Sequence, residues 1–181
     1  INATSNSAVP TGTTYDNGKN ETSIAEALTD YHSAFIGKWH IGGFGAHGYQ
    51  PKDHGFEPLA WFDGGGSAYF NWRKGWDNKS KVVFPKMPQA LNYIEKRSKI
   101  KDQPFFLYFS HFAVHSPYQA IEADIEYFKS KKTKGWNGHK DPVYAAMIKS
   151  MDHSVGAILD KLKDTGLEDN TLVIFMSDNG G

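Results

Sequence analysis

The stretch Ser33-Ala34-Phe35-Ile36-Gly37-Lys38-Trp39-His40 decides how the rest of this chain is interpreted. Its first four residues are mostly apolar, which predicts a short buried β-strand that ends at Gly37. The loop predicted after it begins with Lys38 and His40, two positions apart. If the strand conformation continues, both side chains lie on one side and can bind an oxyanion. In the simpler alternative, Lys38 is solvated and His40 is a loop residue bonded to the backbone.

Two further apolar runs have the same arrangement. Residues 105–109 (Phe-Phe-Leu-Tyr-Phe) precede a polar loop with His111 and His115, and residues 171–176 (Thr-Leu-Val-Ile-Phe-Met) lead into Ser-Asp-Asn-Gly. Helical periodicity precedes each run, over residues 22–28, about 88–100 and about 142–165. Three helix–strand units predict an α/β domain, layered α/β/α around a mostly parallel sheet, with ligands at the C-terminal ends of the strands.

Asp178 and Asn179 follow the third run directly. Asp-Asn-Gly is a common turn sequence, and a turn is one interpretation. The functional alternative is a site for a hard cation, because a carboxylate and an amide oxygen are ligands that Ca²⁺ or Mg²⁺ accepts.

The region from Gly42 to Gly75 is dense in glycine and aromatic residues and has no sustained period. We expect a long, shaped loop there, of a kind that is usually functional. Its aromatic side chains either pack against the domain or stack on sugar rings. They are Trp61, Phe62, Tyr69, Phe70 and Trp72, with Trp76 just beyond.

Composition excludes several classes of function. The chain has 181 residues, with 20 Lys plus Arg against 20 Asp plus Glu, so net charge predicts no nucleic-acid or anionic-membrane partner. It contains no cysteine, which excludes disulfides, thiolate metal sites and a cysteine nucleophile within these residues. Its longest apolar runs are far too short to span a membrane.

Four strings of the sequence resemble the type I sulfatases of the alkaline phosphatase superfamily, and together they cover most of the chain. The first is Thr22-Ser23-Ile24-Ala25-Glu26-Ala27-Leu28 with Ile36-Gly37-Lys38-Trp39-His40-Ile41-Gly42. Pro51-Lys52-Asp53-His54-Gly55-Phe56-Glu57 follows, with Glu57 in place of the usual Asp. Phe105-Phe106-Leu107-Tyr108 with His115-Ser116-Pro117 is the third. The last runs from Met151-Asp152-His153-Ser154-Val155-Gly156 to Asp169-Asn170-Thr171-Leu172-Val173-Ile174-Phe175-Met176-Ser177-Asp178-Asn179-Gly180.

The resemblance implies an alkaline-phosphatase-like fold and a role for each matching site residue. Lys38 and His40 would contact the sulfate and the nucleophile, with His40 as the base that breaks down the covalent intermediate. His115 would meet the bridging oxygen. Asp178 and Asn179 would bind a divalent cation, Ca²⁺ or Mg²⁺. These roles suit sulfuryl transfer, which spreads negative charge over the non-bridging oxygens.

The chain departs from the family pattern in what it lacks. The formylglycine nucleophile arises from Cys or Ser in a C/S-x-P-S-R motif, and residues 1–181 contain no such motif. The early pair of aspartates and a later lysine are also absent. We therefore expect residues 1–181 to be part of a sulfatase catalytic domain, an incomplete fold without the N-terminal nucleophile and metal segment and the C-terminal part. Alone, it should not hydrolyse sulfate esters, should bind Ca²⁺ weakly, and should self-associate through uncovered surfaces.

Two alternatives remain beside a sulfatase acting on sulfate esters, including those of sulfated carbohydrates. One is a phosphodiesterase or phosphonate hydrolase of the same superfamily, which shares the metal scaffold and much of the anion site. The other is a non-catalytic module that binds carbohydrate through the aromatic loop. By family habit, the location would be the periplasm, the outside of the cell or, in an animal, the lysosome.

Overall fold

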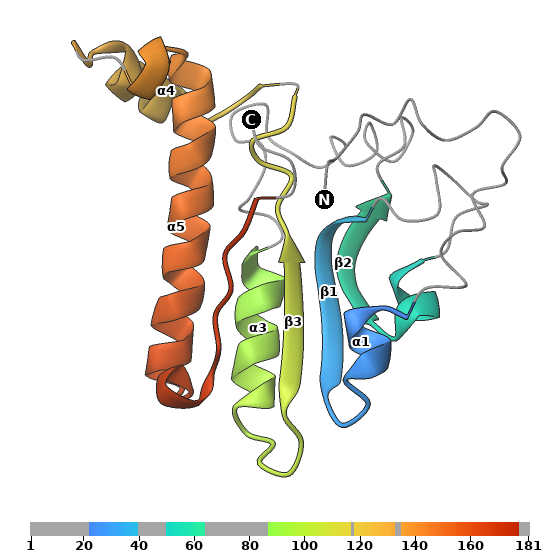
Figure 1. Cartoon of the computed structure of the whole chain (residues 1–181). Helices are drawn as coiled ribbons and strands as arrows, with labels where there is room; N and C mark the ends of the chain where they lie inside the picture. The colour runs from blue at the N-terminus through green and yellow to red at the C-terminus, as the bar shows by residue number, and fades with distance from the viewer. Residues whose placement is uncertain (1–21, 40–49, 64–86, 117, 133–134, 178–181) are drawn as a thin grey trace, which may run out of the picture.

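A computed structural model describes residues 22–39, 50–63, 87–116, 118–132 and 135–177, and the structural statements below concern these residues (Figure 1). The elements are α1 (Ile24–Ala27), β1 (His32–Trp39), η3 (Pro51–His54), β2 (Glu57–Asp63), α3 (Met87–Arg97), β3 (Phe105–Ser110), α4 (Glu122–Lys129), η4 (Trp136–Gly138), α5 (Pro142–Asp164) and η5 (Glu168–Asn170). No helix among the described residues is both long and apolar enough to cross a membrane.

The described strands form one sheet in the order β2-β1-β3, and β1 is parallel to both neighbours. Their C-terminal ends all lie at the upper end of the molecule in Figure 1. The parallel α/β architecture predicted from the helix–strand pattern is therefore confirmed.

One face of the sheet is covered by the short helix α1. Ser23 caps this helix and forms a capping box with Glu26, so the helix predicted within residues 22–28 is confirmed. Ala25 packs in a buried cluster with the strand residue Phe35 and with Phe56. The Phe35 and Phe56 rings lie 5.7 Å apart, edge to face, which is a favourable aromatic geometry.

The opposite face is covered by α3, whose buried residues include Ala90, Tyr93 and Ile94. The Tyr93 ring lies 5.7 Å from the Phe105 ring of β3, and its hydroxyl donates to the His32 carbonyl oxygen at 2.7 Å. Burial raises the pKa of Tyr93, so this phenol remains a neutral donor. The predicted helix over about 88–100 is confirmed, with its end at Arg97.

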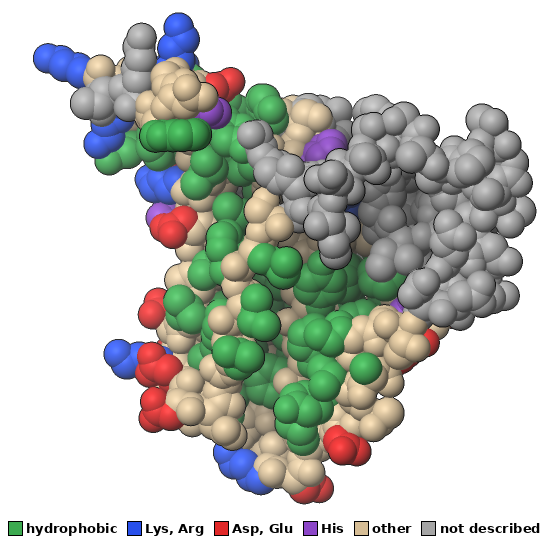
Figure 2. All heavy atoms as spheres, in the orientation of Figure 1, with side chains coloured by type: hydrophobic (Ala, Val, Ile, Leu, Met, Phe, Trp, Pro, Cys, Tyr) green, Lys and Arg blue, Asp and Glu red, His purple; other side chains and the backbone are tan. Residues whose placement is uncertain are grey.

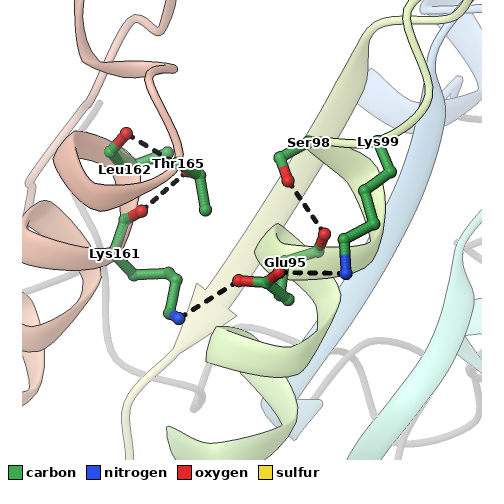
Figure 3. A network of polar contacts seen from close by, with 6 residues as sticks. All are labelled: Glu95, Ser98, Lys99, Lys161, Leu162 and Thr165. Atoms are coloured by element: carbon green, nitrogen blue, oxygen red, sulfur yellow. Dashed lines mark hydrogen bonds and ion pairs between the residues drawn. The ribbon is translucent and has the colours of Figure 1, made fainter.

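Helix α5 packs against the outside of α3 and against α4. Asp141 caps it by accepting from the backbone N–H groups of Val143 and Tyr144. Figure 3 shows the polar link between the helices, in which Lys161 of α5 lies 3.3 Å from the Glu95 carboxylate of α3. Lys99 binds the same carboxylate at 3.0 Å, and these contacts lower the pKa of Glu95.

Three details differ from the sequence-based expectations. β1 does not end at Gly37 but continues through Trp39. Strand β2 and the short helix η3 lie inside the region expected to be a loop, because β2 pairs with β1 despite its irregular apolar pattern. Helix α4 was not predicted.

The prediction of a third buried strand at residues 171–176 is wrong. Residues 171–177 form no strand, and the side chains of Leu172, Ile174 and Met176 are 85%, 72% and 78% exposed. β3 was also expected to be buried, yet its residues are half-buried or, at Tyr108, exposed. Both segments are exposed because strand pairing is incomplete around them. β3 is an edge strand of the described sheet, and no described strand pairs with residues 171–177.

Candidate active site

The C-terminal ends of β1 and β3 approach closely at Gly37. This glycine pairs with Ser110 across the parallel strands and has a φ of 109°. A Cβ atom at Gly37 would overlap the Ser110 carbonyl oxygen. Glycine is therefore required here for both its conformation and its size. The close approach brings the residue after Gly37 next to the loop that follows β3.

That residue is Lys38, whose side chain is half-buried at the end of β1. Its Nζ atom lies 5.8 Å from the centroid of the Phe112 ring, within the range of a cation–π interaction. Phe112 is buried in the loop after β3. The ammonium group is thus held at the C-terminal edge of the sheet, where open parallel sheets bind ligands.

His115 contacts the same phenylalanine from its own loop. The two rings lie 5.3 Å apart, and the His115 backbone N–H donates to the Phe112 carbonyl oxygen at 2.9 Å. Nδ1 of His115 lies 2.8 Å from the Ser116 carbonyl oxygen. Since a carbonyl only accepts, Nδ1 carries a proton, and Nε2 remains for a ligand. The side chain is exposed, so a ligand in solvent can reach it.

His111, in the same loop, has a different environment. Its ring stacks on Phe109 with the centroids 4.3 Å apart, and burial lowers the pKa of His111 to about 4. It is therefore neutral at neutral pH and supplies no positive charge to an anion.

Trp39 anchors the end of β1 on the opposite face from Lys38, as strand alternation requires. Its buried ring lies 5.0 Å from Phe35 and 5.5 Å from His54. The Ser23 hydroxyl donates to the His54 carbonyl oxygen at 2.7 Å, and His54 Nδ1 lies 3.7 Å from the Glu26 carboxylate. The segments before β1 and before β2 are therefore joined beneath Trp39, and this scaffold supports the position of Lys38.

The structure brings two of the five predicted site residues together, Lys38 and His115, around Phe112. His40, Asp178 and Asn179 lie outside the described residues, so their place in the site stays a prediction. Within the described part of the chain, no three His, Asp or Glu side chains gather as a metal site.

Sequence reasoning missed two contributors to this geometry. Gly37 was interpreted as the end of a strand, although it allows the contact between β1 and β3. Phe112 was treated as loop sequence, although its ring contacts both Lys38 and His115. A buried aromatic residue between two histidines was the available signal. The side chains of the predicted aromatic loop lie outside the part of the chain that the structure describes, so their role stays a prediction.

The fold is a parallel α/β sheet with Lys38 and His115 near the C-terminal ends of its strands, and comparison with known proteins identifies the family. Residues 2–181 match the Sulfatase family, so the chain belongs to the sulfatases. The sulfatase YdeN of Escherichia coli is 30% identical in an alignment of length 176 that covers 83% of this chain and 31% of that protein. The arylsulfatase of Klebsiella aerogenes is 28% identical, over 88% of this chain and 47% of that protein.

Solved structures show the same fold. The crystal structure of Ps i-CgsB has a TM-score of 0.60 and 25% identity, over 83% of this chain and 38% of that one. The same protein in complex with k-i-k-neocarrahexaose has a TM-score of 0.58 and 26% identity, with the same coverage. The alkaline-phosphatase-like architecture expected from the sequence is thus confirmed for the part of the fold that is present. The chain spans about a third to a half of the curated relatives it matches.

Proposed function

We propose that this chain supplies the sulfate-binding side of an active site that hydrolyses sulfate esters. The observation that carries the proposal is that Lys38 and His115 both contact the Phe112 ring, at the C-terminal edge of a parallel sheet. Membership of the sulfatase family supports the choice of sulfate over other anions.

In this proposal Lys38 binds the non-bridging oxygens of the sulfate group. Negative charge on these oxygens must be stabilised as the sulfur–oxygen bond to the leaving group breaks, and a fixed cation does so without reorganisation. The half-buried position of Lys38 strengthens the effect, because a charge partly removed from water is screened less.

His115 protonates the leaving oxygen. Its Nδ1 proton is held by the Ser116 carbonyl oxygen, which orients the ring and leaves Nε2 to donate when the imidazole is charged. An alkoxide is a poor leaving group, so a proton supplied at the bridging oxygen lowers the barrier.

The remaining roles rest on the resemblance. His40 would act as base in the second step, and Asp178 and Asn179 would hold a Ca²⁺ or Mg²⁺ ion. The donor set fits such an ion, since both residues offer oxygen ligands. When bound, the cation would polarise the sulfate. The nucleophile would be a formylglycine, and we assign that role to no residue of this chain.

For the substrate class we propose sulfate esters of carbohydrates. The supporting observation is the complex of the structurally similar Ps i-CgsB with k-i-k-neocarrahexaose, a sulfated carbohydrate.

The first test is sulfate binding by this chain, followed by NMR of the histidine side chains at constant ionic strength. Added sulfate should shift the His115 ring signals, and Lys38→Ala should weaken that response at least about fivefold, equivalent to about 1 kcal/mol. Lys163→Ala is the matched control, because Lys163 is an exposed lysine near the far end of α5. An unchanged response in Lys38→Ala would refute the proposed anion site.

The second test is turnover by the full-length protein. Hydrolysis of 4-nitrophenyl sulfate should exceed that of bis(4-nitrophenyl) phosphate, and Lys38→Ala should lower kcat/KM for the sulfate at least about a hundredfold. Preference for the phosphate diester would instead support the phosphodiesterase alternative.

A further inference from the structure

The connection from α4 to α5 concentrates positive charge in a chain that is neutral overall. Residues 129–140 read Lys-Ser-Lys-Lys-Thr-Lys-Gly-Trp-Asn-Gly-His-Lys and contain five lysines and no acidic residue. We call this stretch the basic connection. It is described by the structure except for residues 133 and 134.

Trp136 is the apolar centre of the basic connection and is 88% exposed. The turn that carries it is closed by backbone hydrogen bonds, from the Gly135 N–H to the His139 carbonyl oxygen at 2.7 Å and from the His139 N–H to the Trp136 carbonyl oxygen at 3.2 Å. The indole is thus presented to solvent by a turn of defined shape. An exposed tryptophan on a closed turn offers a flat apolar face to a ligand.

Within the basic connection Lys129 is paired with Glu126, but three other described lysines are not neutralised by a carboxylate. Lys131 places its Nζ 4.3 Å above the ring centroid of Tyr127, where it lowers the pKa of that phenol. Lys132 and Lys140 form no ion pair within the described part of the chain.

Nearby carboxylates are already engaged. Glu126 binds Lys129 at 2.6 Å, and Asp124 binds Lys149 of α5. Asp141 caps α5 through its carboxylate oxygen. Lys131, Lys132 and Lys140 are therefore available to an external anion.

The basic connection also lies at the end of the molecule where the described strands terminate. Figure 1 places α4 and the start of α5 at the same end as the arrowheads of the strands, and Figure 2 shows lysine side chains gathered around α4. The chain reaches α4 directly from the loop of His115, through Tyr118, whose half-exposed ring packs on Tyr144 of α5 at 5.5 Å. The loop of His115 is thus linked to the first turn of α5 through the contact between Tyr118 and Tyr144.

We propose that the basic connection binds the sulfated carbohydrate chain beyond the ester that is cleaved. Trp136 stacks on a sugar ring, and Lys131, Lys132 and Lys140 bind neighbouring sulfate groups. The proposal rests on the proposed sulfatase function for the identity of the ligand. A repeating ligand with apolar faces and anionic groups matches an aromatic face bordered by cations. Nucleic acid offers similar chemistry, but the balanced charge of the whole chain disfavours it.

The test is calorimetric titration of this chain with a sulfated neocarrahexaose, in parallel with its desulfated form. Trp136→Ala and the triple variant Lys131→Gln, Lys132→Gln, Lys140→Gln should each weaken binding of the sulfated sugar at least about fivefold, and the desulfated sugar should bind weakly to all proteins. The matched control replaces three exposed lysines away from α4, in Lys96→Gln, Lys101→Gln, Lys163→Gln. It should bind as the parent does.

Unchanged binding in both variants would overturn the proposal, as would an equal loss in the control. Equal or tighter binding of a single-stranded oligonucleotide would also overturn it in favour of a nucleic-acid surface. The proposed function fails separately, because Lys38→Ala tests the response to inorganic sulfate, to which Trp136 makes no contribution.

Discussion

At the scale of single residues, the contact between Gly37 and Ser110 controls the geometry of the candidate site. Lys38 can lie over the loop after β3 because the strand before it approaches so closely. A side chain at position 37 would require an unfavourable φ and would overlap backbone atoms, which cannot move as easily as a flexible side chain.

We therefore expect Gly37→Ala to lower the free energy of unfolding by at least about 2 kcal/mol, combining strain and overpacking. Urea denaturation followed by circular dichroism measures it. Gly156→Ala is the control, because Gly156 lies inside α5 and a Cβ atom added there would meet nothing within 4 Å. This substitution should stabilise the chain by up to about 1 kcal/mol. Equal stability of the two variants would contradict the role given to Gly37.

A second prediction at this scale concerns His111 and pH. Burial lowers the pKa of His111 to about 4 in the folded state, against about 6.5 in an unfolded chain. Between these values the unfolded state binds more protons, so stability is fully present above about pH 6.5 and is lost as pH falls towards 4. The loss should reach about 2 to 3 kcal/mol.

Urea titrations at pH 7 and pH 4.5 check this, and His111→Gln should remove most of the slope. His153→Gln, at an exposed position of α5, should keep it. A parent slope that survives in His111→Gln would assign the effect to another group.

At the scale of elements, α5 shows how packing departs from a simple apolar stripe. The apolar residues that recur at helical spacing within residues 142–165 predict one inner face, and they are Met147, Met151, Val155, Ile158, Leu159 and Leu162. Met147 and Leu162 are buried as predicted, but Leu159 is 45% exposed. Ser150 and Ser154 are fully buried instead. Small residues there let α5 lie close to its neighbours, a choice that periodicity alone does not reveal.

The two serines allow a matched test. Ser150 donates to the Ala146 carbonyl oxygen at 3.1 Å, whereas the Ser154 hydroxyl is buried with no hydrogen-bond partner in the described structure. Ser154→Ala should therefore raise the free energy of unfolding by about 1 kcal/mol, because a desolvated and unbonded hydroxyl is removed. Ser150→Ala should change it less or lower it. Differential scanning calorimetry on both variants decides between these outcomes, and a destabilised Ser154→Ala would be contrary to this account.

At the scale of the whole molecule, apolar surface remains uncovered beside β3. Residues 171–177 are mostly apolar, and Figure 1 shows them as an extended red segment that runs between α5 and α3. An open strand edge together with exposed Leu172 and Ile174 favours association with other chains.

We expect the chain to associate with increasing concentration, as measured by sedimentation velocity. The double variant Leu172→Asp, Ile174→Asp should shift the distribution towards monomer, because charges oppose burial of this segment. Ile24→Asp, at an exposed apolar position on α1, should have little effect. A monomeric parent across the micromolar range would contradict the prediction.

The sequence by itself determined the class of fold, the family and the position of the candidate chemistry. Helical and strand periods report local burial, and the strings around Lys38 and His115 are specific enough to name a family. These are properties of neighbouring residues, which the sequence records directly.

Only the tertiary structure decided which strands pair and which side chains from distant segments come into contact. Residues 57–63 form the strand β2 because they pair with β1. Residues 171–176 are more apolar but form no strand, because no described strand pairs with them. Backbone pairing depends on what lies alongside, which no local pattern contains. The meeting of Lys38 and His115 over Phe112 is of the same kind, since it depends on Gly37 fitting against Ser110 from a distant part of the chain.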